Sequence, residues 1–506
     1  MDTTIPPAPG DGRCGSSHPD VINPSPPHTS EVSPPKDRRV FSILALAATG
    51  LTSPCFVDGL GSRVECGELS VPLHHAEPDG EQLPLAFVRL PAQSATPAPD
   101  PIVVIPGGPG QSGRSIAAMA GGLLRDANVD RDIVIIDPRG TGSSNKLACP
   151  FEDDDFADDR ERIVAETVAC RDQLDTDLTA YGSEAVADDL DRLRQALAAP
   201  TLNLWGGSWG TRAALVYARR YPAHTRTLTL DSVAPTDWTI GAHMGADAQQ
   251  ALTRVFQACA DETGCSEAFP ALPRRFDTLM NRLDARPFAA DLAHPLTGAT
   301  REESFNALRA GSAIRGMLYS DAMIRVLPYT IIQAFEGRYA PLHAAAEAFN
   351  SGMLDDIAFG MMLSVLCSED IGRLEAADIS AAERTSFMGD QVFKFWMTAC
   401  SVWPRHAVAP DFHEPVTSDI PSLLIAGQWD PVTPPYTAHQ AARTLSNSRV
   451  LEVAGAAHIA SRRGCIAELT SRFIDTADPQ SLDTRCVTDI QPKAFFIDAT
   501  GPELPE

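Results

Sequence analysis

Short apolar runs bounded by proline and glycine recur along the chain and predict buried strands. An alternating stretch at residues 69–90 contains a turn at 77–80, as expected of an antiparallel hairpin. Continuous apolar runs follow at 101–105 and 131–136, and runs of this kind are typical of parallel strands covered on both faces. Further strand-like runs lie at 201–205, 225–230, 422–426 and 449–453.

Helical periodicity separates these runs and sets the fold class. Helix-like segments lie at 190–197, 211–220 and 466–474. Strands that alternate with helices predict an α/β protein with a mainly parallel, doubly wound sheet. Between about 242 and 404 helix-like segments dominate and strand-like apolar runs are missing, which predicts a helical cap inserted into the sheet domain. The expected division is a core at 55–241, the cap at 242–404, the second part of the core at 405–490 and a C-terminal tail at 491–506.

The segment 201–221 carries the first candidate chemistry. It runs from a strand through Gly206-Gly207-Ser208-Trp209-Gly210 into a helix, which is the context in which G-x-S-x-G indicates a nucleophile elbow. Side chains at the flanking glycines would crowd this sharp turn. A serine becomes nucleophilic only beside a positioned base, so partners are required.

Asp430 and His458 supply those partners. Each follows a strand-like run, and the order Ser208, Asp430, His458 is that of α/β-hydrolases. The carboxyl ends of parallel strands meet at one edge of the sheet, where such sites gather. Asp231, also at a strand end, is the alternative acid.

An acyl-transfer site also needs two N–H donors for the oxyanion. Gly108, in the glycine-rich turn after the strand at 101–105, and Trp209, after the nucleophile, are the expected donors. Asp137 and Arg139 are expected to form a structural pair that braces this loop.

The composition indicates which class of protein this is and which partners are excluded. The 506 residues are 44% hydrophobic and 21% charged, as in a globular protein, and the net charge of −25 argues against a nucleic-acid partner. Residues 1–38 are rich in Pro, Ser and Gly and predict disorder. Basic residues and a nine-residue apolar run then form a signal-like segment at 39–54, too short for a stable membrane span. A secreted or periplasmic location is expected, or alternatively the run is only a hydrophobic stretch after a real extension.

The cysteines agree with export. Ten of the eleven follow the signal-like run, and they show neither a C-x-x-C pair nor zinc-ligand spacing, so disulfides are expected and no metal site is predicted. Pro54 fits poorly with a lipid anchor at Cys55. Cys14 is left over in the extension. The neighbouring couples are Cys55/Cys66, Cys149/Cys170, Cys259/Cys265, Cys367/Cys400 and Cys465/Cys486.

An ordered set of motifs resembles a known family. PGGPGQSG, DPRGTGSS, GGSWGTR, GQWDPVTPP and GAAHI look like those of the proline iminopeptidase and tripeptidyl aminopeptidase family of α/β-hydrolases. Many members begin the first motif with His, and the Pro106 form looks like the exported, tripeptidyl-aminopeptidase-like branch. The resemblance covers about residues 55–490 and is weak through the middle.

The resemblance implies an exopeptidase that binds a substrate's free N-terminus through cap carboxylates, without a metal or cofactor. The matching segment is Cys367-Ser368-Glu369-Asp370, so Glu369 first and Asp370 second are the expected substrate-binding residues, and it also favours the Cys367/Cys400 bridge. The alternatives are an esterase or amide hydrolase with the same machinery and a catalytically silent binding protein. Peptide substrates are the expected partners.

Overall fold

The computed structural model describes residues 50–149, 159–349, 356–375 and 379–502. The expectations for the extension at 1–38, for Cys14 and for most of the signal-like segment lie outside these ranges. Within them, no helix is long and apolar enough to cross a bilayer.

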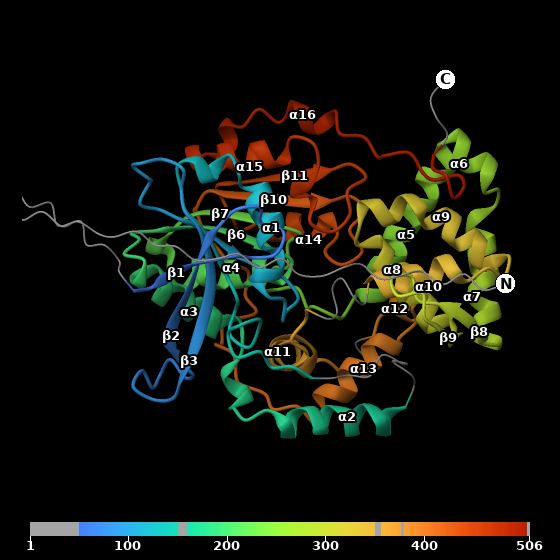
Figure 1. Cartoon of the computed structure of the whole chain (residues 1–506), viewed down its shortest axis with the longest axis horizontal. Helices are drawn as coiled ribbons and strands as arrows, with labels where there is room; N and C mark the ends of the chain where they lie inside the picture. Colours follow the sequence, from blue (N-terminus) through green and yellow to red (C-terminus); the bar gives the residue numbers. More distant parts are fainter. Residues whose placement is uncertain (1–49, 150–158, 350–355, 376–378, 503–506) are drawn as a thin grey trace, which may run out of the picture. The chain divides into compact units, whose positions relative to one another are not determined.

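One nine-stranded sheet forms the centre of the protein (Figure 1). Parallel pairing joins the six neighbouring strands β5, β4, β6, β7, β10 and β11, whereas β1, β2 and β3 add an antiparallel extension at one edge. In sheet order the strands are β1 (Thr52–Cys55), β2 (Val64–Pro72), β3 (Gln82–Leu90), β5 (Ile133–Ile136), β4 (Ile102–Ile105), β6 (Leu202–Gly207), β7 (Thr225–Asp231), β10 (Ser422–Gly427) and β11 (Ser448–Val453).

The central strands are apolar throughout because helices cover both faces of the sheet. Successive side chains of a strand point to opposite faces. In β4, Ile102 and Val104 therefore join one apolar cluster, while Val103 and Ile105 join another. The first cluster includes α1 (Gly113–Leu123) and α15 (Ile466–Thr476), and the second includes α2 (Arg160–Gln173), α3 (Ser183–Ala196), α4 (Trp209–Arg220) and α14 (Pro435–Ala442).

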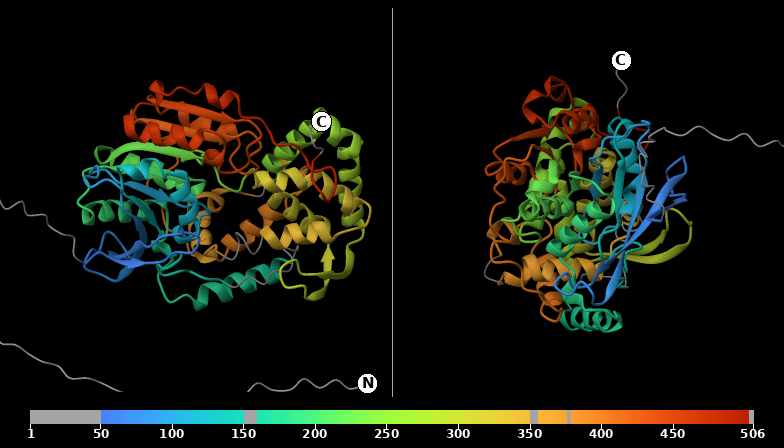
Figure 2. Two further views of the ribbon diagram at one scale, coloured as in Figure 1. Left: turned by 45° about the horizontal axis from the view of Figure 1, so that its top comes forward. Right: turned by 90° about the vertical axis from the view of Figure 1, so that its left-hand side faces the viewer.

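A long insertion between β7 and β10, here called the cap, adds a third apolar cluster. Figures 1 and 2 show α5 to α10 as a group of helices away from strands β1–β3. Helices α11 and α13 instead pack in the cluster of α3 and α4. The cap elements are α5 (Met244–Asp261), α6 (Thr263–Ala268), α7 (Leu272–Ala285), β8 (Phe288–Ala293), β9 (Thr300–Phe305), α8 (Ala307–Leu318), α9 (Asp321–Phe335), α10 (Ala340–Phe349), α11 (Phe359–Val365), α12 (Ala381–Arg384) and α13 (Gln391–Cys400).

The hairpin β8–β9 was not expected from the sequence. Its strands pair from Phe288 with Phe305 to Ala293 with Thr300, and most of their side chains are exposed or only half-buried. An exposed hairpin does not need a continuous apolar run, so the pattern that identifies buried strands misses it.

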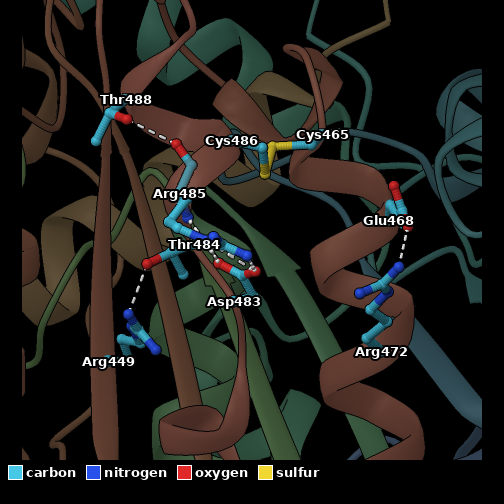
Figure 3. Close-up of a disulfide and its surroundings, with 9 residues drawn as sticks. All are labelled: Arg449, Cys465, Glu468, Arg472, Asp483, Thr484, Arg485, Cys486 and Thr488. Carbon is cyan, nitrogen blue, oxygen red and sulfur yellow. Dashed lines mark hydrogen bonds and ion pairs between the residues drawn. A yellow bond between two sulfur atoms is a disulfide. The ribbon is translucent and has the colours of Figure 1, made fainter.

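All five neighbouring cysteine couples are disulfides, which confirms the expected pairing. The sequence separations range from 6 residues for Cys259–Cys265 to 33 for Cys367–Cys400. Figure 3 shows Cys465–Cys486, which joins the start of α15 to α16 (Arg485–Thr488) beside surface ion pairs such as Glu468–Arg472. Five disulfides are typical of a protein that folds in an oxidising compartment. The remaining pairs are Cys55–Cys66 and Cys149–Cys170.

The beginning of the fold corrects one expected boundary. Residues Thr52 to Cys55 form β1 and pair with β2, and Cys55 is bonded to Cys66. The last residues of the signal-like segment 39–54 therefore belong to the folded sheet. The bridge also leaves no free Cys55 thiol for a lipid anchor.

The junction of β6 and α4 depends on two glycines. A Cβ atom on Gly206 would lie 2.5 Å from the carbonyl oxygen of Gly210, and one on Gly210 would lie 2.2 Å from the carbonyl oxygen of Ile105. Contacts this short with rigid backbone cannot be relieved by a rotamer change. The helix therefore crosses directly over the end of β4 because neither position carries a side chain.

We expect Gly210→Ala to destabilise the protein by more than about 2 kcal/mol, since overpacking against backbone costs 1–3 kcal/mol or more. Gly122→Ala is the matched control, because a Cβ at that exposed position in α1 meets nothing within 4 Å. The control should be neutral or stabilising by up to about 1 kcal/mol. Urea unfolding of both variants measures the difference, and equal stability of the two would contradict this account.

Candidate active site

Ser208 occupies the turn between β6 and α4 in a strained conformation. Its backbone has φ of 57° and ψ of −126°, a region that residues with a Cβ rarely adopt. The Ser208 N–H donates to the carbonyl oxygen of Asp231 at 2.9 Å, which fixes the turn to the end of β7. Strand, strained serine and helix are the arrangement expected of a nucleophile elbow.

Asp430 and His458 are brought together as expected. His458 Nδ1 lies 2.8 Å from Asp430 Oδ2, and Asp430 is 1% exposed. The other oxygen of Asp430 accepts the N–H groups of Val432 and Thr433, and the Thr433 hydroxyl donates to Oδ2 at 2.9 Å. Burial alone would raise the pKa of Asp430, but His458 and the hydrogen bonds outweigh it and hold this pKa below its ordinary value.

Asp231, the alternative acid, has a different position. Its carboxylate accepts the N–H groups of Ala460 at 3.0 Å and Ser461 at 2.8 Å, which are the second and third residues after His458. Ser232 Oγ accepts the N–H of Ile459 at 2.8 Å. The end of β7 thus holds both the serine turn and the histidine loop, while Asp430 contacts the ring. Burial raises the pKa of Asp231 to about 6.

The structure places the serine and the histidine on adjoining loops but not in direct contact. Among the described residues no hydrogen bond joins Ser208 Oγ to the ring of His458. Catalytic hydrogen bonds of this type often tighten only when substrate is bound.

Both expected oxyanion donors flank Ser208. Gly108 has φ of 103°, and a Cβ on its neighbour Gly107 would lie 2.9 Å from Ser208 Cβ, so this loop passes directly over the nucleophile. The Gly107 N–H is used by Gln111 Oε1 at 3.2 Å, which leaves Gly108 as the loop donor. Trp209 is the first residue of α4, so its N–H has no acceptor within the helix.

Glu369 and Asp370, the expected ligands of the substrate N-terminus, are both used inside the protein. They lie on the helical turn Leu366–Asp370 after α11 and are at most 1% exposed. Glu369 accepts the N–H of Ser183 at 2.6 Å and its hydroxyl at 2.7 Å. That hydroxyl accepts the indole N–H of Trp209 at 3.2 Å.

Asp370 is neutralised by a cation from the core. Arg212 Nη1 contacts both carboxylate oxygens at 2.7 and 2.9 Å, and the N–H of Ile240 donates at 2.8 Å. The charge of Asp370 therefore already has a buried partner in this structure, and its expected role in binding substrate stays a prediction. Burial raises the pKa of Glu369 to about 7, so this second carboxylate is itself costly to ionise.

Asp137 and Arg139 do not form the expected pair. Asp137 accepts the N–H groups of Arg114 at 3.0 Å and Ser143 at 2.8 Å, which joins the start of α1 to the following turn. Arg139 is fully buried and pairs with Asp189 at 2.6 Å. Both residues are structural, but through different partners.

A carboxylate that the sequence did not reveal lies on the cap near the pair formed by Asp430 and His458. Asp247, on α5, is 7% exposed and accepts from Tyr436 Oη at 3.2 and 3.3 Å. Among the residues that the structure describes, no cation forms an ion pair with it. Burial, reinforced by the charges of Glu383 and Asp430 and opposed only in part by Tyr436 and the charge of Arg315, raises the pKa of Asp247 to about 7. Nothing in its local sequence distinguishes Asp247 from any helical aspartate.

One group in the described ranges has ligand atoms at metal-like separations. Atoms of Glu303, His343 and Glu347 lie within 4.8 Å of one another in the cap. Both oxygens of Glu303 are already used by Arg301 and Arg309, and Arg301 also contacts Glu347. This group is an ion-pair network, and it is remote in sequence from the elbow and the dyad.

Comparison with known proteins agrees with the geometry. A model described as the alpha/beta hydrolase fold matches residues 100–258, which contain Ser208. A model described as a TAP-like protein matches residues 385–486, which contain Asp430 and His458. The chain has the α/β-hydrolase fold, and its residues 385–486 are similar to the TAP-like family. The fold expectation and the resemblance to tripeptidyl aminopeptidases are both confirmed.

Three curated relatives of this α/β-hydrolase are informative. Serine protease Hip1 of Mycobacterium tuberculosis is 27% identical over 448 residues, covering 81% of this chain and 84% of Hip1. Tripeptidyl aminopeptidase of Streptomyces lividans is 30% identical over 199 residues, 35% of this chain and 37% of its own length. Carboxylesterase B of Mycobacterium tuberculosis is 31% identical over 224 residues, 40% and 42% of the two chains. These similarities support a serine hydrolase.

We expect Asp370→Asn to cost about 3–5 kcal/mol of unfolding free energy, because it leaves the buried Arg212 without a counter-charge. Asp390→Asn is the matched control: Asp390 forms a partly exposed pair with Lys394 at 3.0 Å and should contribute less than about 1 kcal/mol. Chemical denaturation of the two variants compares them. A fully stable Asp370→Asn variant would contradict the structural role of this buried pair.

Proposed function

We propose that this protein is a serine exopeptidase that hydrolyses peptide bonds near a free N-terminus through an acyl-enzyme. The observation that carries this proposal is the buried 2.8 Å contact between His458 and Asp430 on a loop that shares its anchor, Asp231, with the turn of Ser208. The motif resemblance and the similarity to a serine protease and a tripeptidyl aminopeptidase favour a peptide substrate.

Each residue then has a defined task. Contact of Asp430 with Nδ1 fixes the tautomer and leaves Nε2 of His458 to take the Ser208 proton as Oγ attacks the carbonyl carbon. The N–H groups of Gly108 and Trp209 stabilise the developing oxyanion. His458 returns the proton to the leaving amine. In the second step His458 takes a proton from water, the water attacks the ester carbonyl, and Ser208 Oγ leaves with that proton.

The substrate ammonium needs a carboxylate that is not already neutralised, and we assign it to Asp247 in place of Glu369 and Asp370. Asp247 lies on the cap, hydrogen-bonds to Tyr436, and is close enough to Asp430 for their charges to interact. An ammonium group entering beside it forms a charge-assisted hydrogen bond and relieves the repulsion among these carboxylates.

The location and partners follow from the same proposal. An exported, secreted or periplasmic enzyme that acts on peptides agrees with the disulfides and with the acidic surface. We propose no metal, cofactor or nucleic-acid partner.

Ser208→Ala should lower turnover by about 10⁶-fold, as in serine hydrolases that lose their nucleophile. The variant keeps the elbow backbone, so its circular dichroism and thermal unfolding should match the wild type. Steady-state hydrolysis of a peptidyl arylamide measures the effect, and near wild-type turnover would end the assignment of Ser208.

Matched substrates separate the exopeptidase from the esterase alternative, which the similarity to carboxylesterase B keeps in view. One-, two- and three-residue arylamides with free N-termini should be cleaved, and their N-acetylated forms should not. Equal cleavage of free and blocked amides, with faster hydrolysis of acetate esters, would favour the esterase. A protein that fails to react with a fluorophosphonate probe would be a silent binding protein.

The pH dependence of KM tests Asp247. Its raised pKa of about 7 means that the carboxylate is ionised above this pH and neutral below it. The KM for free-amine substrates should therefore rise as pH falls through about 7, whereas the substrate amine itself stays protonated below about 8. Asp247→Asn should have a high KM with no such dependence, and the KM for a small acetate ester should show no effect in either protein. An unchanged profile in Asp247→Asn would remove this residue from the binding site.

A further inference from the structure

We infer that the cap is a positioning element for the general base, with Asp321 as its principal residue. The inference rests on the proposed function only in taking His458 as the base. In this arrangement the core and the end of the insertion around α11 place Ser208 and its oxyanion donors, whereas the part of the cap from α5 to α10 holds the residues that precede His458 and Asp430. Reactivity toward every substrate then depends on the cap, including substrates too small to touch it.

Asp321 makes the most direct connection. It is the first residue of α9, and its Oδ1 accepts the N–H of Ala457, the residue before His458, at 2.7 Å. Its Oδ2 pairs with Arg463 at 3.2 Å, just after the histidine loop. One cap carboxylate therefore bridges both sides of the loop, and the N-terminus of α9 favours its negative charge.

Tyr319, at the end of α8 and two residues before α9, contacts the imidazole itself. The Tyr319 ring packs edge-on against the His458 ring with centroids 5.2 Å apart and an interplanar angle of 68°. Arg315 stacks over the Tyr319 ring at 5.1 Å and thereby limits its movement. A fixed ring at this distance restricts rotation of the imidazole about its side-chain bonds.

Apolar packing extends the connection to the acid. Trp429 and Ala457, the residues immediately before Asp430 and His458, are buried in the apolar cluster of the cap rather than in either cluster of the sheet. Trp429 stacks with Phe495 at 6.3 Å, and the Phe495 N–H donates to Glu262 beside α5. Arg254 of α5 donates to the carbonyl oxygen of Gln428. Residues of the cap and of the C-terminal segment therefore contact the loops that carry Asp430 and His458.

These contacts matter because the base must be aligned with the serine. The Ser208 proton can be accepted only if Nε2 points at Oγ, and an error of about 1 Å in such a geometry can cost about 10²-fold in rate. The core contributes Ser232 and Asp231 after His458. Before His458, Asp321 accepts the N–H of Ala457 and the Trp429 N–H donates to the carbonyl oxygen of Ala456 at 2.9 Å, so losing Asp321 removes one of these two hydrogen bonds.

Asp321→Ala should lower kcat by about 10²-fold for a free-amine arylamide and for a small acetate ester alike, with KM changed less than about threefold. Asp321→Asn retains an oxygen that can accept the Ala457 N–H, although it loses the pair with Arg463, and should recover most of kcat. Asp277→Ala, an exposed position on α7 of the same cap, is the matched control and should match the wild type.

The outcomes separate this inference from the proposed function. An unchanged kcat in Asp321→Ala, or a change only in KM for the arylamide, would overturn the inference about Asp321. Such a result would leave the proposed function intact as long as turnover still depends on Ser208. If the wild type cleaves only esters, the exopeptidase proposal fails and the ester arm still tests Asp321. Should Asp321→Ala not fold, Tyr319→Leu carries the same expectation of a kcat loss on both substrates, with full activity as the contradicting result.

Discussion

The site depends first on how closely the backbone of α4 approaches the ends of β4 and β6. Gly206 and Gly210 permit an approach that any Cβ would prevent, and the turn that results forces Ser208 into a positive φ. Strain of this kind persists only where the surroundings hold it. Here the Ser208 N–H is tied to Asp231 on the next strand. The half-buried serine is therefore held at the strand ends by the close packing of α4 and by the hydrogen bond to Asp231.

The loops of Asp430 and His458 contact the cap as well as the sheet. Asp430 and His458 stand on loops of the sheet domain, yet the residues before them are buried among cap side chains. Cap residues also provide Asp247 beside this pair. Trp209, next to Ser208, packs in a cluster of the sheet, whereas the residues before Asp430 and His458 pack in the cluster of the cap. The position of the cap relative to the sheet therefore affects the position of His458 relative to Ser208.

Local sequence predicted the residues whose roles are local and missed those whose roles depend on tertiary partners. Ser208, Asp430 and His458 follow apolar runs that can only be buried strands, so their common edge could be foreseen. Glu369 and Asp370 look like free carboxylates in the chain, because nothing nearby shows that Ser183 and Arg212 will meet them. Arg139 fails for the same reason, since Asp189 lies fifty positions away. Asp247 has no signal at all without the positions of Tyr436 and Asp430.

The disulfides have a consequence for how the molecule forms. Every bridge joins a cysteine to the next one in the described chain, and none closes a loop longer than the 33-residue separation of Cys367 and Cys400. Short loops close at small entropic cost, so proximity alone favours the native partner over more distant thiols. A chain that enters an oxidising space from its N-terminus can therefore complete each bond before the next pair arrives, and correct oxidation requires no later exchange of partners.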